Sequence, residues 1–280
     1  MLLSQLTFID LFDKPYIRLF PKFWIMPRPT KKGMVAFLDT LGTRDLSLQG
    51  ATDYVDRQAI FITKLKTILP QHESFKEMKQ KDPDISDPMI VWFADTIIIT
   101  WEIKGFPDFP KEFNLVFGEW LGTGLVLALA NKLPIRGAIG YGAYFYEGEH
   151  TVLGPAVGDV ASWHDEADWI GIIASPNYGA KLTLVEEQLK IERGEDFPLR
   201  NHYVRYDVPL KKGDKQQLWA VSWPLYYYYQ LKKIIPDATD TGMAPFMQHI
   251  CCFSMPKGTE SKFNNAIDFF GWYRKHHNLR

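Results

Sequence analysis

The segment 89-MIVWFADTIIITW-101 constrains the fold of this chain more than any other. It is apolar almost throughout, as in a strand buried on both faces, but a single acid, Asp95, interrupts it. A carboxylate in the middle of a buried strand is costly unless the chain turns there or the carboxylate binds something. The segment therefore predicts two strands joined by a tight turn at Ala94–Asp95.

A second acid follows an apolar run in the same way. In 35-VAFLDTLGT-43 the run ends in Asp39 and the chain breaks at Gly42. A lone acid at a strand end is usually a turn or capping residue. Two such acids from adjacent strands have a further use, because Mg²⁺ in nucleotide sites takes one or two carboxylates together with phosphate oxygens. We therefore interpret Asp39 and Asp95 as candidate metal ligands, followed by a turn whose N–H groups could face phosphates.

The order of the apolar patterns predicts an α/β sandwich, with helices packed against a mixed or antiparallel sheet. Residues 1–32 are aromatic and basic and are interpreted as an arm. The polar, charged segment 71–88 is expected to be a surface loop. Further strands are expected at 134–148, at 169–175 and within 203–224, and helices at 55–69, 110–131, 154–168, 177–192 and from 225 onward.

Composition excludes some classes of function. The chain has 280 residues, of which 46% are hydrophobic, so it can bury a sizeable core. The formal net charge is -1 and no long basic run appears, so there is no electrostatic case for nucleic-acid binding. No apolar run approaches the ~20 residues of a membrane span, and Asp10 and Asp13 interrupt the first apolar stretch. We expect a soluble, cytoplasmic protein without a membrane partner.

The string Asp39-Thr-Leu-Gly-Thr43 resembles the first motif of the haloacid-dehalogenase phosphatases, D-x-D-G-T. That resemblance implies a phosphatase with Asp39 as its nucleophile and a second acid that moves a proton. Here the second position is Leu41, which cannot transfer one. The late acidic pair of that family is approximated only by Asp159 and Asp165, at the wrong spacing. We rank this hypothesis below the next one.

Four landmarks between residues 33 and 176 resemble class III nucleotidyl cyclases, in the right order. The metal-binding strand F-x-D-I-x-G corresponds to 37-FLDTLG-42, and the G-D hairpin turn corresponds to Ala94–Asp95. The later strand R-x-G-I-x-x-G corresponds to 136-RGAIGYG-142, and G-x-x-V-N before a helix corresponds to 154-GPAVG-158. Each motif alone is weak support for the resemblance, but four motifs in the family's order make it specific.

The resemblance implies a ferredoxin-type sandwich over residues 33–224, with 225–280 as a helical extension packed on the same domain. It implies a nucleotide cyclase in which two divalent metal ions, Mn²⁺ or Mg²⁺, bridge Asp39 and Asp95 and a ribose 3′-oxygen attacks the α-phosphate of a nucleoside triphosphate. It also implies a homodimer with the site at the interface, and a downstream receptor for the cyclic nucleotide. The main-chain N–H groups that would hold the β- and γ-phosphates are those of Thr40, Leu41, Gly42 and Thr43.

The chain departs from the family at the residues that stabilise the transition state. Gly158 and Ser162 stand where the family has an Asn and an Arg, and neither carries a charge. Arg44, Arg136 and His164 are the nearby candidates to compensate. We place Arg136 with the catalytic residues and Arg44 with those that bind the substrate. Their alternative interpretations are a strand-end ion pair for Arg136, a surface charge for Arg44 and a polar helix face for His164.

The residues that would select the base depart as well. Val91 stands where purine cyclases carry a lysine, and the second selector falls on Thr151, which keeps a hydroxyl. In this respect the chain resembles the bacterial antiphage pyrimidine cyclases, which make cyclic UMP or cyclic CMP. The resemblance thus implies UTP or CTP as the substrate. The alternative is a catalytically degenerate cyclase domain that binds a nucleotide or a partner without turnover.

Overall fold

The computed structural model describes residues 30–43, 46–104, 110–147, 151–194, 199–234, 243–251, 253 and 257–277. Residues Lys31–Arg280 form one compact unit, and the description below concerns that unit. The arm expected at 1–32 lies almost entirely outside the described residues.

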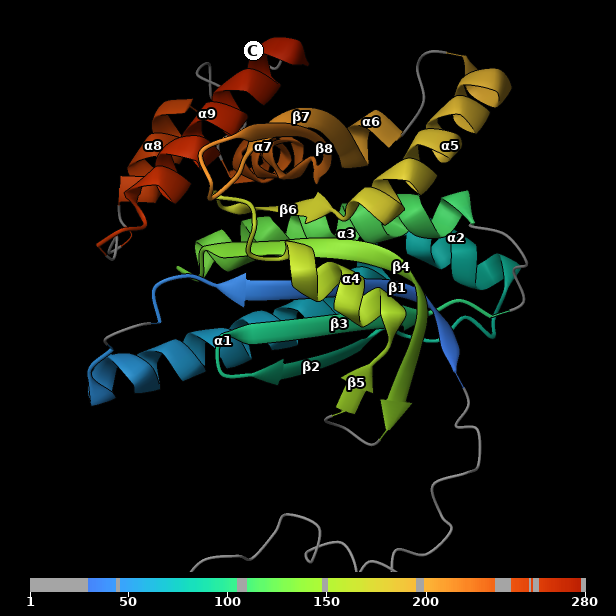
Figure 1. Ribbon diagram of the computed structural model, residues 1–280, viewed down its shortest axis with the longest axis horizontal. Helices are drawn as coiled ribbons and strands as arrows, with labels where there is room; N and C mark the ends of the chain where they lie inside the picture. The colour runs from blue at the N-terminus through green and yellow to red at the C-terminus, as the bar shows by residue number, and fades with distance from the viewer. Residues whose placement is uncertain are drawn as a thin grey trace, which may run out of the picture. The chain divides into compact units, whose positions relative to one another are not determined.

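The core of the unit is a single sheet in which most neighbouring strands are antiparallel (Figure 1). The strand order is β2-β3-β1-β4-β6-β8-β7, and β5 pairs with β4 beside this path. Only β4 and β6 run parallel among the described strands. The predicted α/β class with a mixed sheet is confirmed. The strands are β1 (Lys31–Thr40), β2 (Met89–Phe93), β3 (Thr96–Glu102), β4 (Ile135–Glu147), β5 (Thr151–Leu153), β6 (Gly171–Ala174), β7 (Tyr203–Pro209) and β8 (Lys215–Val221).

Helices cover the sheet, with α4 in front of β1 and β4 in Figure 1 and α1 and α3 behind. A 3₁₀ turn, η3 (Leu69–Gln71), joins α1 to α2. The helices are α1 (Leu48–Ile68), α2 (Glu73–Lys81), α3 (Lys111–Ala130), α4 (Pro155–Trp163), α5 (Pro176–Arg193), α6 (Leu199–His202), α7 (Trp223–Ile234), α8 (Met243–Cys251) and α9 (Glu260–His276).

The central strand β1 is hydrogen-bonded to β3 on one side and to β4 on the other. Its register places Asp39 opposite Thr96 of β3 and opposite Arg136 of β4. The next residue of β4, Gly137, lies so close to β1 that an added Cβ would sit 2.5 Å from the Phe37 carbonyl oxygen. The small residues of β4 therefore let it pack tightly against β1, beside the two charged residues.

The predicted turn at Ala94–Asp95 is confirmed, and it joins β2 to β3 as a hairpin. Ala94 has a φ of 52°, a left-handed conformation that glycine adopts more easily than alanine. The buried apolar run before Asp95 and the run after it are thus two neighbouring strands, and the acid lies between them at the sheet's edge.

The loop expected at 71–88 was a wrong prediction, because residues Glu73–Lys81 form α2. Phe75 and Met78, three residues apart, lie on one face of this short helix and are only 4% and 7% exposed. The charged residues between them obscure the helical period in the sequence.

Helix α3 is long and apolar enough, by length and composition, to cross a membrane. However, 72% of its most apolar window is buried inside the folded unit, where α3 packs against α1, α7 and the sheet. The packing accounts for its composition as a core helix, and one such helix is weak evidence for a span.

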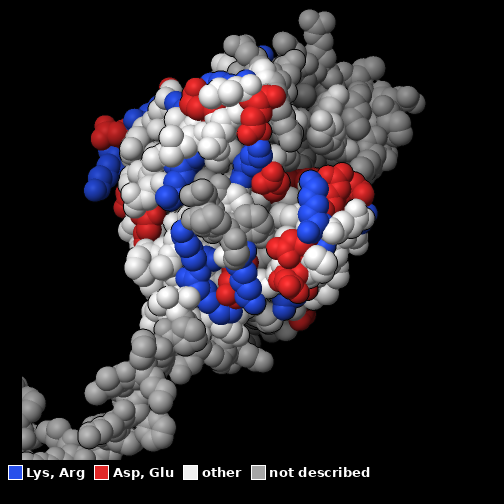
Figure 2. All heavy atoms as spheres, turned by 90° about the vertical axis from the view of Figure 1, so that its right-hand side faces the viewer, with Lys and Arg blue, Asp and Glu red and all other residues white. Residues whose placement is uncertain are grey.

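Basic and acidic side chains are interspersed on the face of the molecule that Figure 2 shows, which is the right-hand side of Figure 1. Over the described part of that face, neither sign of charge forms a continuous field.

Candidate functional site

Asp39 and Asp95 lie at the same edge of the sheet, as their positions in the sequence predict. The backbone carbonyl of Asp95 accepts hydrogen bonds from the Thr40 N–H at 2.9 Å and from the Thr40 hydroxyl at 3.2 Å. The charge of Asp95 also contributes to raising the pKa of Asp39. The two candidate metal ligands are thus held side by side, and their roles remain a prediction.

The Asp95 carboxylate is oriented by the loop that follows β1. The Thr43 hydroxyl donates to its Oδ2 at 2.9 Å. This contact folds the loop back onto the β2–β3 hairpin.

The Asp39 carboxylate is paired with Arg136 from β4. The guanidinium donates to Oδ2 through Nε at 3.0 Å and Nη2 at 2.9 Å, and its Nη1 donates to the Asp165 carbonyl at 3.3 Å. The side chains of Arg136 and Asp39 are only 12% and 15% exposed. Burial raises the pKa of Asp39 above its usual value in spite of the lowering by Arg136. The carboxyl is therefore less easily ionised than one in water until a further cation reaches it.

His164 is the second candidate cation near Asp39. Its ring packs 4.5 Å from the ring of Phe37, the residue two before Asp39 on β1, and its Nδ1 contacts the Ala161 carbonyl at 2.7 Å. Its charge would lower the pKa of Asp39. The structure thus brings Arg136 and His164 to Asp39, while the third candidate, Arg44, lies outside the described residues.

Two residues of α1 support the site and were not anticipated from the sequence. The Tyr54 hydroxyl hydrogen-bonds to the Thr40 hydroxyl, and the Gln58 amide donates to the Ala94 carbonyl at 2.9 Å. Both side chains are buried, at 8% and 3% exposure. The spacing of apolar residues predicts Val55 on the buried face of this helix, but it is 58% exposed. The sequence does contain a signal for this buried face. Gln58 follows Tyr54 by four residues, at the helical spacing of Ile62 and Leu65.

The predicted phosphate turn is corrected in part. The Thr40 N–H donates to Asp95, and the Leu41 N–H donates to the Pro134 carbonyl at 2.8 Å, so both are used at the end of the sheet. Strand β1 runs on to Thr40, and hydrogen bonds at its end take two of the N–H groups expected to face phosphates. Among the described residues of the turn, the N–H groups of Gly42, with a φ of 89°, and Thr43 remain for a ligand.

Thr151 does not meet the two acids within one chain. It lies exposed on β5, opposite Glu147 at the far end of β4. From Arg136 to Glu147 the strand advances by about 36 Å at the usual rise per residue. A site that includes both Thr151 and Asp39 therefore requires a second chain.

The positions that replace the family's Asn and Arg lie on α4. Gly158 faces open space, and the Ser162 hydroxyl donates to the Asp159 carbonyl at 2.7 Å. Neither position supplies a charge, as the sequence indicates.

The phosphatase hypothesis requires a second acid at the position that the D-x-D motif gives it, and the described residues do not place one there. Leu41 packs against the core, Asp159 accepts from Ser175 and Asn177, and Asp165 pairs with Lys211. Among the residues that the structure describes, no acid is therefore left in the position that the D-x-D motif needs.

Within the described ranges, no group of three or more His, Cys, Asp or Glu side chains could hold a metal ion by itself. The donor set at the site is two carboxylates. This fits a Mg²⁺ or Mn²⁺ ion whose other ligands come from phosphates and water, and does not fit a cage made of protein alone.

No family model matches the chain, and no curated protein matches it. Among solved structures, 33 chains match. One is the adenylyl cyclase CyaB from P. aeruginosa, at 13% identity and a TM-score of 0.37, covering 69% of this chain and 94% of that one. Another is the catalytic core of a rhodopsin-guanylyl cyclase with converted specificity in complex with ATPalphaS, at 10% identity and a TM-score of 0.42, covering 69% and 97%.

Proposed function

We propose that this protein is a metal-dependent nucleotidyl cyclase, which converts a nucleoside triphosphate into a 3′,5′-cyclic nucleotide and pyrophosphate. The observation that carries the proposal is the placement of Asp39 and Asp95 at one sheet edge, tied together through Thr40. A pair of strand-end carboxylates next to a turn with remaining N–H groups has the chemistry of a metal–triphosphate site.

Asp39 and Asp95 would hold the two divalent ions, which when bound would acidify the 3′-hydroxyl and neutralise the triphosphate. In the reaction, the 3′-oxygen bonds to the α-phosphorus, the bond from that phosphorus to the bridging oxygen breaks, and pyrophosphate leaves with the electron pair. The proton of the 3′-hydroxyl goes to solvent. Thr43 orients the Asp95 carboxylate, and the N–H groups of Gly42 and Thr43 would bind the terminal phosphates.

Arg136 is the residue to which we assign the charge stabilisation that Gly158 and Ser162 do not provide. Its guanidinium contacts Asp39 directly and would lie within reach of phosphate oxygens of a triphosphate whose metal ion that carboxylate would hold. Before substrate binds, it would serve as the counterion of Asp39.

The base is proposed to be a pyrimidine, from UTP or CTP, and the product a second messenger in antiphage defence. Val91 supports this choice. It is a half-buried strand residue opposite Ile98, and its apolar side chain cannot make the hydrogen bond to a purine that lysine makes in the purine cyclases. Thr151 would act from the partner chain of a homodimer, because it is too far from Asp39 along β4. The hairpin carries two exposed rings, Trp92 and Phe93, at 48% and 83% exposure, which suit an interface with a second copy.

The decisive experiment incubates the full chain separately with ATP, GTP, CTP and UTP and Mn²⁺, and identifies the products by mass. We expect a cyclic pyrimidine nucleotide and pyrophosphate, lost in Asp39→Asn and in Asp95→Asn. The matched control is Asp53→Asn, an exposed acid on α1 whose carboxylate accepts only from Gln49 among the described residues. Release of inorganic phosphate instead would favour the phosphatase, and the absence of any cyclic product would refute the proposal.

A second candidate is a degenerate cyclase domain that binds nucleotide without turnover. The observation in its favour is that Arg136 already occupies Asp39 Oδ2 while Gly158 and Ser162 of α4 supply no charge. This candidate predicts saturable nucleotide binding by calorimetry with no product from any of the four triphosphates.

A further inference from the structure

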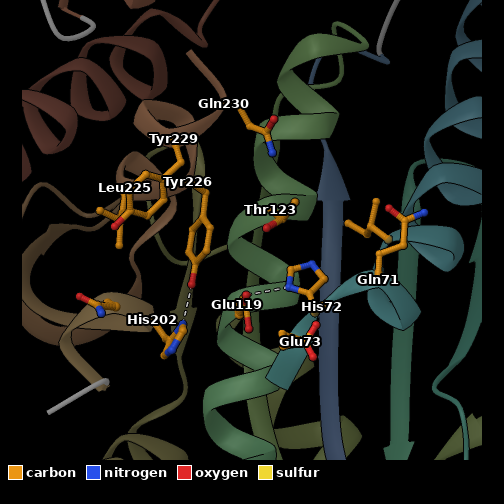
Figure 3. A pocket seen from close by; sticks show the side chains of 12 residues that line it. Gln71, His72, Glu73, Glu119, Thr123, His202, Leu225, Tyr226, Tyr229 and Gln230 are labelled. Carbon is orange, nitrogen blue, oxygen red and sulfur yellow. Dashed lines mark hydrogen bonds and ion pairs between the residues drawn. The ribbon is translucent and has the colours of Figure 1, made fainter. Parts of the chain in front are cut away.

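A polar cavity of about 470 Å³ lies on the helical side of the unit, at the other end of α1 from Asp39. It is open to solvent and is lined by α3, by α6 and α7 on one side, and by the end of α1, η3 and the start of α2 on the other (Figure 3). Helix α1 spans about 30 Å, and no residue that lines this cavity belongs to the site around Asp39. The volume is in the range of small-molecule sites.

The cavity wall is formed by a close approach of α7 and α6 to α3. A Cβ added to Gly122 would lie 2.3 Å from the ring of Tyr226, and one added to Gly118 would lie 2.9 Å from the Cβ of His202. Two glycines one turn apart therefore let Tyr226 and His202 pack onto α3 at the turn that carries Glu119. The wall in this form depends on glycine at positions 118 and 122, because a larger side chain at either position would clash with it.

The floor carries an ionised carboxylate. His72 Nδ1 lies 2.8 Å from Glu119 Oε1, and the Ser74 hydroxyl donates to Oε2. Burial alone would raise the pKa of Glu119, but these two hydrogen bonds hold it below its usual value. A carboxylate has about four lone-pair positions, so two are left for a further donor.

The other polar groups of the cavity carry no compensating positive charge. Burial lowers the pKa of His202 to about 4, so this ring is neutral at physiological pH, and its Nδ1 is engaged with the Tyr226 hydroxyl. The described lining residues include Glu73 and Glu119 but no lysine or arginine. The other histidine of the lining, His72, is already paired with Glu119, so a phosphate would meet two acids and no unpaired cation among the described lining residues.

One hydroxyl on the wall has no partner among the described residues. Thr123 is 9% exposed and lines the cavity, and its hydroxyl makes no hydrogen bond to any residue that the structure describes. This hydroxyl is therefore available to water or to a polar ligand in the cavity.

Apolar groups line the side formed by α7. Leu225 and the rings of Tyr226 and Tyr229 belong to that wall, and Figure 3 shows these rings on the side opposite His72. Aromatic rings next to a carboxylate favour a cation that carries an apolar body, through cation–π contact and burial.

We propose that this cavity binds a small organic cation, an amine with an apolar or aromatic body, whose ammonium group pairs with Glu119 and hydrogen-bonds to Thr123. The ligand's body lies against Tyr226 and Tyr229. This site is separate from the proposed cyclase site and requires neither metal nor nucleotide.

Calorimetry on the full chain, without metal or nucleotide, tests the proposal with tyramine as the probe. The matched uncharged compound is 4-ethylphenol, and inorganic phosphate is the anion. We expect saturable 1:1 binding of tyramine, at least tenfold weaker binding of 4-ethylphenol, and no binding of phosphate.

Glu119→Gln should weaken tyramine binding at least tenfold, whereas Glu112→Gln, an exposed acid in the first turn of the same helix, should leave it unchanged. Tyr229→Ala, at a half-exposed position, provides a second variant that should weaken binding about fivefold without a change in melting temperature. Equal binding of the uncharged compound, binding of phosphate in place of the amine, or no saturable binding of tyramine would overturn the proposal. So would unchanged affinity in a folded Glu119→Gln or Tyr229→Ala variant.

Discussion

Asp39 and Glu119 are both largely buried carboxylates with a cationic or polar partner, yet their pKa values shift in opposite directions. Burial raises the pKa of Asp39 although Arg136 donates two hydrogen bonds to it. Burial acts on Glu119 as well, but hydrogen bonds from His72 and Ser74 hold its pKa low.

The difference follows from how the donors are distributed. Both bonds from Arg136 reach one oxygen of Asp39, and the nearby charge of Asp95 opposes ionisation. Glu119 instead receives one donor on each oxygen. A carboxylate with a donor on each oxygen is stabilised as an anion, whereas one with donors on a single oxygen beside another acid is held closer to its protonated form. Glu119 is therefore a stable negative charge that can still accept a further donor, and Asp39 keeps one oxygen that receives no bond from Arg136.

The largest effect is expected from breaking the Asp39–Arg136 pair. Arg136→Met leaves a buried carboxylate without its counterion, and the free energy of unfolding should fall by about 3 kcal/mol at pH 7. Urea unfolding measures this change. The double variant Asp39→Asn/Arg136→Met should recover most of the loss.

The control for this pair is Lys211→Met, which breaks the Lys211–Asp165 pair, whose side chains are 40% and 39% exposed. Its effect should be below about 1 kcal/mol, because solvent screens exposed pairs. Equal losses in the two single variants would contradict the buried character of the Asp39 pair.

The next effect concerns pH and His202. Its pKa is about 4 in the folded chain, against an ordinary value of 6.5 in the unfolded chain, so both states are neutral above pH 6.5. As the pH falls from 6.5 to about 4, the unfolded chain takes up a proton that the folded chain does not. The free energy of unfolding should therefore decrease by about 3 kcal/mol over this window.

His202→Gln should remove that pH dependence, while His276→Gln, at an exposed position of α9, should keep it. Chemical unfolding at a series of pH values provides the measurement. A wild-type profile that is flat between pH 6.5 and 4 would show that His202 is accessible to protons.

A smaller effect is expected for Glu119→Gln, which removes a charge-assisted network. The folded pKa of Glu119 lies below its usual 4.5, so its stabilising contribution is present above pH 4.5 and is lost as the pH falls through the folded value. We expect a loss of about 1 kcal/mol at pH 7 that disappears in acid, with Glu112→Gln close to wild type at both pH values. A loss of the same size at every pH would indicate a packing effect.

The smallest effect tests the turn that presents Asp95. Ala94→Gly relieves the left-handed conformation and should stabilise the chain by about 0.5 kcal/mol. Ala59→Gly, in the exposed interior of α1, should destabilise by about 1 kcal/mol. Thermal unfolding distinguishes the two, and the same sign for both substitutions would contradict the assigned turn conformation.

Most of the sheet could be predicted from the sequence because its strands are apolar runs with clear breaks. The hairpin at Ala94–Asp95, the strand ending near Asp39 and the long helix at 110–131 were all predicted where the structure has them. Helix α2 was missed because only Phe75 and Met78 carry its apolar signal among charged residues. The buried face of α1 was also misplaced, since Tyr54 and Gln58 are amphipathic and polar residues that a hydrophobic pattern does not select.

The sequence by itself determined that two acids end two apolar strands, because a carboxylate in a buried run forces a turn or a ligand. Only the tertiary structure decided that Arg136 pairs with Asp39, since that contact depends on the register of two strands separated by almost a hundred residues. It also decided that the N–H groups of Thr40 and Leu41 donate to carbonyl groups at the end of the sheet, and that His72, Glu119, His202 and Tyr226 line one cavity. Such contacts between distant segments are set by packing and strand register, which local sequence patterns do not encode.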